Sequence, residues 1–554
     1  MVSSAIVASE SLRRDAHYHP SIWEDHFLIY NLKSNETEAK VEQQQLEQLK
    51  VEVRKVLVEA THKPCDVQTL ELIDAIQRLG VSYHFETEID QALRRIHNTH
   101  CEGDGDDEED LYTVSLCFRL LRQHGYRVSS EVFNKFSDGE ANFKESLTRD
   151  VRGMLSLHES AQLRVHGEAI LEKANSFTMS RLESSVSDLS PPIAAQVKQA
   201  LKRPIRKGLE KLEARNYMSV YQEQNHHNKA LLMFSKLDFN LLQKLHQKEL
   251  AEITMWWKGL NFAEKLPFGR DRVVECYFWV VGVYFEPRQF LARRILSKVI
   301  AMASFLDDIY DVHGTIEELR LLTDAIERWD INAMDHLPEY LRVFYQALLD
   351  VYGEIEEEMA REKNAYRVYY AKEAMKILAR AYMEEAMWLH ENHMPTMGEY
   401  MSVALISGGY HMLAVASLLG MGDLVTKDTF EWISNKPKIV NASSVICRLM
   451  NDIVSHKIEQ ERGNDVSAVQ CYMKEFDASE QRTVTELQKQ VGDAWKDMNE
   501  EWLGGSAAPK DVLKRVVNLA RVIDLIYKDD DGYVHAVTVL KGPVTSLFID
   551  PVPI

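Results

Sequence analysis

Apolar residues recur at three- and four-residue steps along almost the whole chain. The stretches LRVHGEAILEKANSF (163–177) and KALLMFSKLDFNLLQKLHQKELAEI (229–253) are typical, and this period is that of an amphipathic helix. Only 24 glycines and 14 prolines interrupt 554 residues, so we expect long helices. Neither an alternating run between turn residues nor a fixed-period repeat is present, which argues against a sheet and a solenoid. The pattern predicts an all-α fold.

Two interruptions of the helical pattern suggest domain boundaries. The beginning of the chain is irregular, with HYHPSIW (17–23) unlike a helix, and polar residues cluster in RNYMSVYQEQNHHNKAL (215–231). A chain of this length also exceeds one ordinary core. We therefore expect an N-terminal segment over residues 1–29, one helical domain over 30–225 and a second over 226–554.

Composition narrows the classes of partner. The formal charge of −20 argues against nucleic acids, whose binders present basic faces, but allows a small anion held by local arginines. The six cysteines are scattered, which indicates free thiols in a reducing compartment. No apolar run reaches the roughly 18 residues of a membrane span, and the first residues lack a signal-peptide pattern. We expect a cytoplasmic monomer.

Three carboxylates follow an apolar helix in AMASFLDDIYDVHGT (301–315). On a helix, Asp307 and Asp311 stand at i and i+4 and share one face, with Asp308 beside them. Carboxylates gathered in a poorly solvated cavity repel each other. A hard cation such as Mg²⁺ removes this conflict, because it takes one or two carboxylates together with substrate phosphates. Taken alone, the cluster is equally a solvated acidic helix end.

A second polar cluster lies in ICRLMNDIVSHKIEQERG (446–463). Asn451, Ser455 and Glu459 stand at i, i+4 and i+8 and form one stripe of oxygen donors suited to a metal. Arg448 precedes Asn451 by three residues and lies on the same side. Taken alone, this stripe is also explained as a polar helix face.

The third element is a short loop, KLPFGRDRVVE (265–275). Arg270 and Arg272 follow a proline and a glycine, and guanidinium groups clamp phosphate oxygens in bidentate fashion. An R-x-R pair alone is a weak signal. Together with the two oxygen-donor clusters, however, it predicts a binding site for a metal–diphosphate.

In this order and spacing, the three motifs resemble those of the plant class I terpene synthases. Arg13-Arg14 followed by Trp23 looks like the tandem-arginine and tryptophan motif of that family. Similar stretches continue through the chain, at IDAIQRLGVSYHF (73–85), FRLLRQHGY (118–126) and YFEPRQFLAR (284–293). The resemblance is greatest to cytosolic sesquiterpene synthases of the cadinene and germacrene D synthase group.

The resemblance implies two α-helical barrel domains. The C-terminal barrel, of the class I terpenoid synthase fold, is catalytic, and the N-terminal one is a relict of a class II cyclase domain. Three Mg²⁺ ions are implied, with Mn²⁺ as a substitute. Their ligands are Asp307 and Asp311, supported by Asp308, and on the second motif Asn451, Ser455 and Glu459. The departing diphosphate is held by Arg270, Arg272 and Arg448, and the segment around Arg13 and Arg14 caps the cavity.

The remaining chemistry concerns a carbocation, which aromatic faces stabilise and water quenches. Family position makes Trp279 the first candidate, followed by Tyr410, Tyr527 and Tyr533, although core packing explains each of them as well. LISGGYHML (405–413) predicts a helix break at Ser407-Gly408-Gly409. YKDDDGYVHA (527–536) offers Asp531 and Tyr533 on a loop that looks like a lid.

One acidic motif points elsewhere. Asp104-x-Asp106-Asp107 matches the D-x-D-D of class II cyclases, whose chemistry needs a protonated aspartate in an apolar cavity. This motif lies in a glycine-punctuated run of acids, which predicts an exposed, ionised loop without a catalytic role.

The function expected from these motifs is Mg²⁺-dependent cyclisation of farnesyl diphosphate to a sesquiterpene. Three enzyme alternatives remain: a monoterpene synthase acting on geranyl diphosphate, an acyclic nerolidol- or linalool-type synthase, and a chain-elongating prenyltransferase. The last would carry a second D-D-x-x-D motif where this chain has Asn451, Ser455 and Glu459. The non-enzyme alternative is a helical interaction scaffold, which predicts no binding of Mg²⁺ and diphosphate.

Overall fold

The computed structural model describes residues 18–31, 36–61, 67–102, 110–138, 142–461, 463 and 466–554. Arg13, Arg14 and the Asp104–Asp107 motif lie outside these residues. Compact packing divides the chain into two units. The first unit comprises Met1–Ser34, Leu245–Ala494 and Ala507–Val544, and the second comprises Asn35–Lys244, Trp495–Ser506 and Thr545–Ile554. The domain limits expected from the sequence, 1–29, 30–225 and 226–554, stay a prediction.

The second unit is built from α-helices joined by short 3₁₀ turns. Its helices are α2 (Glu36–Thr61), α3 (Val67–Arg78), α4 (Glu86–Glu102), α5 (Leu111–Gln123), α6 (Val151–Ala161), α7 (Ala169–Ser185), α8 (Pro191–Lys202), α9 (Glu210–Gln222) and the first part of α10 (Lys229–Leu260). Helices α5, α6 and α7 pack against one another in sequence. Phe118, Leu157 and Leu171 form part of the core between them.

The first unit holds the longer succession of helices. They are the rest of α10, α11 (Phe262–Lys265), α12 (Val273–Val283), α13 (Phe290–Asp308), α14 (Ile316–Arg328), α15 (Glu339–Arg361), α16 (Tyr366–His390), α17 (Met397–Ser407), α18 (Tyr410–Ala416), α19 (Lys427–Ser434), α20 (Lys438–Glu461), α21 (Ala468–Phe476), α23 (Lys510–Ile526) and α24 (Ala536–Val539). The first parts of α22 (Glu480–Leu503) and α25 (Lys541–Phe548) also belong to this unit, and their last residues belong to the second.

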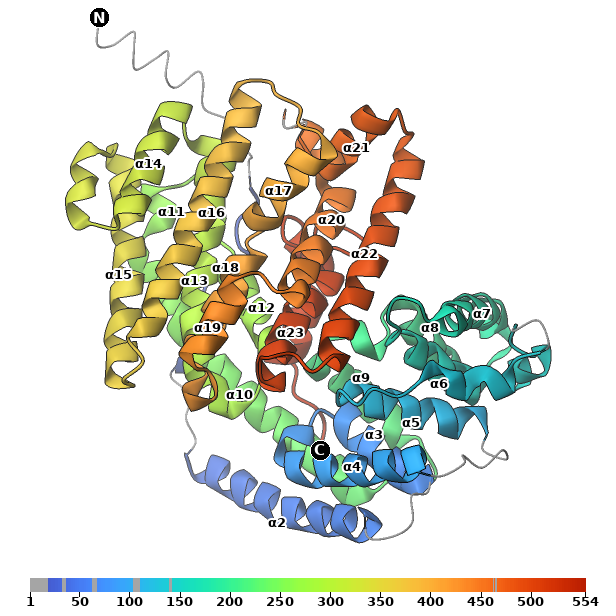
Figure 1. Ribbon diagram of the computed structural model, residues 1–554. Coiled ribbons are helices and arrows are strands. Elements are labelled where there is room, and N and C mark those ends of the chain that lie inside the picture. The colour runs from blue at the N-terminus through green and yellow to red at the C-terminus, as the bar shows by residue number, and fades with distance from the viewer. Residues whose placement is uncertain are drawn as a thin grey trace, which may run out of the picture. The chain divides into compact units, whose positions relative to one another are not determined.

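Helix α12 lies at the centre of the first unit. Its sequence VVECYFWVVGV is apolar almost all round, and a helix of this kind is stable only when it is buried on every side. It packs against α13 and α23, and α23 packs in turn against α20 (Figure 1). Trp279, in the middle of α12, is 7% exposed. Of the two helices that carry the oxygen-donor motifs, α13 therefore packs directly on this buried helix, and α20 is connected to it through α23.

The predicted all-α fold is confirmed. Across the described residues the regular elements are helices, apart from an isolated antiparallel bridge between Ser137 and Phe143. Among the same residues, no helix is long and apolar enough to cross a membrane. The described cysteine side chains, Cys117, Cys276, Cys447 and Cys471, are buried free thiols.

Candidate active site

A cavity of about 260 Å³ opens within the first unit. Its wall is formed by α12, α13, α16, α17, α18 and α20, with the loop after α23 and Tyr18. Most residues that the sequence singled out line this cavity, namely Arg270, Trp279, Asp307, Asp311, Ser407, Gly408, Gly409, Tyr410, Arg448, Asn451, Ser455, Glu459, Tyr527, Asp531 and Tyr533. Two predicted site residues, Arg272 and Asp308, are not part of its lining.

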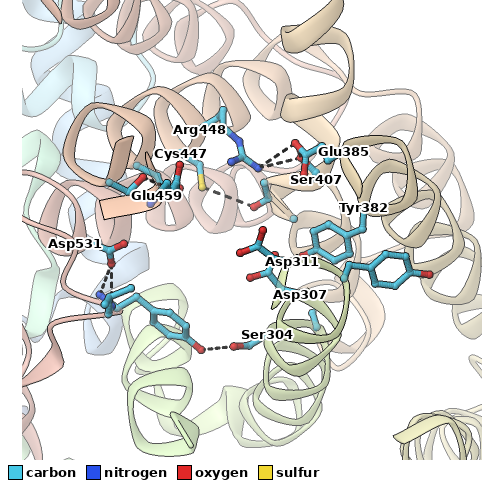
Figure 2. Close-up of a pocket in the computed structure, with 18 of the residues that line it drawn as sticks. Ser304, Asp307, Asp311, Tyr382, Glu385, Ser407, Cys447, Arg448, Glu459 and Asp531 are labelled. Carbon is cyan, nitrogen blue, oxygen red and sulfur yellow. Dashed lines mark hydrogen bonds and ion pairs between the residues drawn. The ribbon is translucent and has the colours of Figure 1, made fainter. Parts of the chain in front are cut away.

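The first acidic motif differs from the uniform helix that its spacing predicts. Helix α13 ends at Asp308, and a π turn, η8 (Ile309–His313), carries Asp311. The amide N–H of Gly314 closes this turn on the carbonyl of Ile309 at 2.8 Å. Asp307 and Asp311 nevertheless both point into the cavity (Figure 2). Single π turns often occur at functional sites.

The turn after Asp311 is fixed by the start of the next helix. Thr315 and Glu318 form a capping box at the beginning of α14, with the Thr315 amide donating to Oε2 of Glu318 at 3.0 Å. This reciprocal bonding satisfies backbone donors that the helix itself leaves open. The capping box thereby sets where the acidic segment must leave the cavity.

Asp308 supports Arg270 from beneath the cavity. Its side chain is fully buried, accepts the amide N–H of Arg270 at 2.7 Å and pairs with Nε of Arg270 at 2.6 Å. Burial raises the pKa of Asp308 to about 6, although Arg270 opposes that shift. The guanidinium also reaches Oδ2 of Asp307 at 2.6 Å, so Arg270 neutralises two carboxylates of the motif.

A glycine lets the arginine loop lie directly on α13. A Cβ atom at Gly269 would come 2.1 Å from the ring of Phe305, so a larger residue would push the loop away. The same close approach brings the Arg270 amide within hydrogen-bonding distance of Asp308. The loop position thus depends on one small residue.

The second oxygen-donor cluster lies on α20. Asn451, Ser455 and Glu459 line the cavity as one stripe, and the Ser455 hydroxyl donates to Oε1 of Glu459 at 2.8 Å. Burial, together with the negative charges of Asp452 and Asp311, raises the pKa of Glu459 to about 8. A cation between the two clusters would reverse this effect.

The donor set fits Mg²⁺. One side offers the carboxylates of Asp307 and Asp311, and the other an amide oxygen, a hydroxyl and a carboxylate. Among the described residues, no three acidic, histidine or cysteine side chains are gathered closely enough to hold a metal by themselves. A sparse set of protein oxygens completed by water and phosphate is the coordination that Mg²⁺ usually takes.

Arg448 lies beside the helix break, with 15% of its side chain exposed. Its Nε donates to the Ala404 carbonyl at 3.2 Å and its Nη2 donates to the Ser407 hydroxyl at 2.9 Å. Its nearest carboxylates stand farther away, Asp452 at 3.5 Å and Glu385 at 3.9 Å. Part of its positive charge is therefore available to an anion in the cavity.

The predicted helix break is present. Helix α17 ends at Ser407, and Gly409 adopts φ +77° before α18 begins at Tyr410. A residue with a side chain is strained at this left-handed angle. The break leaves Ser407, Gly408 and Gly409 in the cavity wall.

An aromatic wall closes the end of the cavity formed by α12. The Trp279 ring lies 5.9 Å from that of Tyr533 in an edge-to-face arrangement and 6.2 Å from that of Tyr410. The Tyr533 hydroxyl is held by Ser304 at 2.7 Å and by the Cys276 thiol at 3.4 Å. The contact with Ser304 is drawn in Figure 2. Burial raises the pKa of both tyrosines well above the usual value, so their phenols stay neutral.

The cavity also has lining residues that sequence reasoning did not identify, among them Glu385, Tyr18, Tyr382, Tyr400 and Cys447. Glu385 lines the cavity and accepts the Ser407 hydroxyl at 2.6 Å, and burial raises its pKa to about 7. It stands on the same stripe of α16 as the buried Tyr382, three residues earlier, so helical spacing could have identified it. Tyr18 also lines the cavity, from an irregular segment whose sequence carries no such signal.

Comparisons with known proteins place these observations in a family. Residues 258–497 match the model of the "Terpene synthase family, metal binding domain" and residues 22–201 that of the "Terpene synthase, N-terminal domain". The chain is 60% identical over 554 residues to the (−)-germacrene D synthase of Vitis vinifera, covering 100% of this chain and 98% of that one. It is 50% identical over 550 residues to the (+)-delta-cadinene synthase isozyme A of Gossypium arboreum, covering 99% and 97%.

A solved structure is also similar over most of its length. The isoprene synthase from grey poplar leaves (Populus x canescens), in complex with three Mg²⁺ ions and dimethylallyl-S-thiolodiphosphate, matches with a TM-score of 0.86. The identity is 34%, over 93% of this chain and 98% of that chain.

Proposed function

Because this chain belongs to the terpene synthase family and is therefore a lyase, we propose that it is a Mg²⁺-dependent synthase that converts farnesyl diphosphate to a cyclic sesquiterpene and diphosphate. The membership confirms the resemblance seen in the motifs and excludes the helical scaffold. Relatives that are named germacrene D synthase and cadinene synthase support a sesquiterpene as the product class. A monomeric state and a cytoplasmic location stay predictions.

The observation that carries the proposal is the division of one cavity into two chemical ends. Oxygen donors and arginines meet at one end, where Asp307 and Asp311 face Glu459 and Arg448 (Figure 2). Aromatic and apolar side chains, with Trp279 among them, form the other. A prenyl diphosphate has the same division into a charged head and an apolar tail.

At the polar end, the arginines bind and orient the diphosphate. Arg448 lines the cavity with its nearest carboxylates 3.5 and 3.9 Å away, and Arg270 is held at the mouth by Asp308. Mg²⁺, held by Asp307, Asp311, Asn451, Ser455 and Glu459, would supply the Lewis-acid stabilisation of the departing diphosphate. Fixed charges aimed at a leaving group require no reorganisation at the moment of reaction.

At the apolar end, the side chains confine the allylic cation and exclude water. The neutral rings of Trp279 and Tyr410 present π faces without a nucleophilic phenolate, and the neutral ring of Tyr533, which also lies 5.1 Å from the Arg270 guanidinium, borders both ends. A ring stabilises a nearby cation by about 0.5–2 kcal/mol. Closing such a site against water also prevents capture of the cation as an alcohol.

The test is incubation of the purified protein with farnesyl or geranyl diphosphate and Mg²⁺, followed by gas chromatography. We expect cyclic sesquiterpenes from farnesyl diphosphate and at least tenfold lower turnover of geranyl diphosphate. The reverse preference would indicate a monoterpene synthase, and nerolidol as the main product an acyclic synthase. Longer prenyl diphosphates formed with added isopentenyl diphosphate would indicate chain elongation. The same reactions with EDTA should yield no hydrocarbon.

A further inference from the structure

Arg272 was expected to hold the diphosphate, but its side chain turns away from the cavity. The residue is 4% exposed. Its Nη1 donates to the carbonyl of His19 at 3.1 Å and to that of Asp271 at 3.0 Å, and its Nε donates to the carbonyl of Tyr533 at 3.2 Å. A rigid guanidinium fork can hold several acceptors at once, which an ammonium group cannot do in the same geometry.

The carbonyls of His19 and Tyr533 belong to two segments that are far apart in the sequence. Both segments also place an aromatic ring against Arg270. The ring of Tyr18, next to His19, lies 4.9 Å from the guanidinium of Arg270, and the ring of Tyr533 lies 5.1 Å from it. Arg270 in turn reaches Asp307 in the cavity. Arg272 thus fixes the backbones on which both of these rings are mounted.

A second contact fastens the N-terminal segment without involving the loop at Tyr533. The indole N–H of Trp23 donates to Oε1 of Glu275 at 2.9 Å, and both side chains are buried. Glu275 also lies close enough to Arg272 for the two charges to interact. Burial raises the pKa of the Glu275 carboxyl, and the positive charge of Arg272 opposes this rise. A buried cation is costly unless anions and acceptors surround it. Arg272 has three carbonyl acceptors and the nearby Glu275, so its charge is already satisfied by the protein.

We propose that Arg272 is a positioning residue that couples the segment at residues 18–31 to the loop at residues 531–535, so that the two covers of the cavity are held together around Arg270. This proposal rests on the proposed function, because closing the cavity matters for the reaction only if a carbocation forms inside it. Arg270 and Arg448 then remain as the arginines that contact the diphosphate, and Arg272 acts through Tyr18 and Tyr533.

Hydrogen exchange of the substrate-free protein tests the coupling directly. The amides of His26 and Leu28 report on the N-terminal segment, and those of Tyr533, Val534 and His535 report on the loop, because each has an acceptor in the structure. Arg272→Gln should accelerate exchange at least tenfold in both groups. Trp23→Phe is the matched control and should accelerate it in the N-terminal segment alone. Unchanged exchange in either group of the Arg272 variant would overturn the proposal.

Calorimetric titration with inorganic pyrophosphate and Mg²⁺ separates coupling from phosphate binding. Arg270→Gln should weaken binding at least tenfold, whereas Arg272→Gln should weaken it less than threefold. Arg272→Lys carries the same test if the Gln variant does not fold. The lysine keeps the positive charge but can donate to only one of the two distant carbonyls, so the amides of both segments should exchange faster than in the wild type. Equal weakening of binding by the Arg270 and Arg272 variants would overturn the proposal.

Products give a third measurement if the protein turns over farnesyl diphosphate. Loosened covers admit water, so the share of alcohols among the products should rise at least threefold in Arg272→Gln. The exchange and calorimetry experiments need no turnover. A failure of the proposed substrate would therefore leave the test of Arg272 intact, and an unchanged alcohol share in an active variant would count against it.

Discussion

Two arginines show how the same side chain serves packing in one place and chemistry in another: Arg122, which is buried in the second unit, and Arg448, which is partly exposed in the first. Arg122 donates to both oxygens of Glu168 and to the carbonyls of Leu163 and Val128. Arg448 donates to a carbonyl and a hydroxyl, and its nearest carboxylates stand 3.5 and 3.9 Å away. The first charge is fully matched at short range, and the second is not.

The partner carboxylates report the same difference. Burial raises the pKa of Glu168, but the bonds and charge of Arg122, together with bonds from the Val165 amide and the Ser130 hydroxyl, outweigh it and hold that pKa below the usual value. At Glu385 burial outweighs the pull of Arg448, and the pKa rises to about 7. A matched buried pair is costly to break, whereas a carboxylate whose pKa stays raised beside an arginine in a cavity is a candidate functional group. Four predictions test this distinction.

The largest effect is expected at the first oxygen-donor cluster. Asp307→Ala removes a carboxylate that contacts the cavity and Arg270 but packs against no core. Turnover with Mg²⁺ should fall at least about 10³-fold, because one preorganised electrostatic group contributes this much. The melting temperature should stay within about 2 °C. Asp350→Ala, at an exposed carboxylate of α15, is the control and should leave both quantities unchanged. Wild-type turnover of Asp307→Ala would refute the assignment of the site.

The opposite result is expected at the matched pair. Arg122→Gln leaves Glu168, whose side chain is 14% exposed, without its cation, and the free energy of unfolding should fall by about 3–5 kcal/mol. Turnover per folded molecule should stay within about twofold, because the residue touches no part of the cavity. Denaturant unfolding and active-site titration measure the two quantities. A loss of less than about 1 kcal/mol would show that the pair is not what stabilises this region.

A third prediction concerns a buried carboxylate of the second unit that lacks a matched arginine. Glu159 accepts the amide N–H of Ile205 at 2.8 Å, and burial raises its pKa to about 7 against the pull of Arg119. A raised pKa of an acid stabilises the fold at low pH, and this contribution is lost as pH rises from about 4.5 through 7.

Glu159→Gln cannot ionise and therefore removes the loss of stability that the wild type shows as pH rises. The stability difference between variant and wild type should grow in favour of the variant by up to about 3 kcal/mol between pH 4.5 and 8. Urea unfolding across this range measures it, and Glu183→Gln, an exposed carboxylate on α7, is the control. A difference independent of pH would show that Glu159 is ionised without cost. The expected dependence on pH would instead show that a raised pKa can occur at a residue outside the cavity and is not by itself a mark of an active site.

Helical spacing predicted the position of most of the site but not the directions of side chains in its irregular parts. Asp307, Asn451 and Glu459 face the cavity because they continue an amphipathic period. The π turn after α13 was not predictable, since it depends on how the segment meets the capping box of α14. Arg272 turns inward because its acceptors come from segments distant in sequence, and a local pattern contains no information about them.

The smallest effect is expected at Trp279, and it separates two explanations of the aromatic wall. If the ring stabilises a cation, loss of the π face should cost more than loss of volume. Trp279→Phe keeps a ring and should remain active, with altered product proportions. Trp279→Leu keeps an apolar side chain but loses the quadrupole, so turnover should fall about tenfold or more, equivalent to about 1.4 kcal/mol.

Binding of Mg²⁺ and pyrophosphate should survive in both Trp279 variants, because Trp279 lies on α12 and the oxygen donors lie on η8, α13 and α20. Calorimetry checks this, and steady-state rates with gas chromatography check turnover. The ring also packs edge-to-face with Tyr533 at 5.9 Å, so thermal unfolding must be measured for both variants. Equal rates for the Leu and Phe variants at equal stability would show that Trp279 only fills the wall, as an ordinary core residue does, and that cation stabilisation lies with Tyr410 or Tyr533.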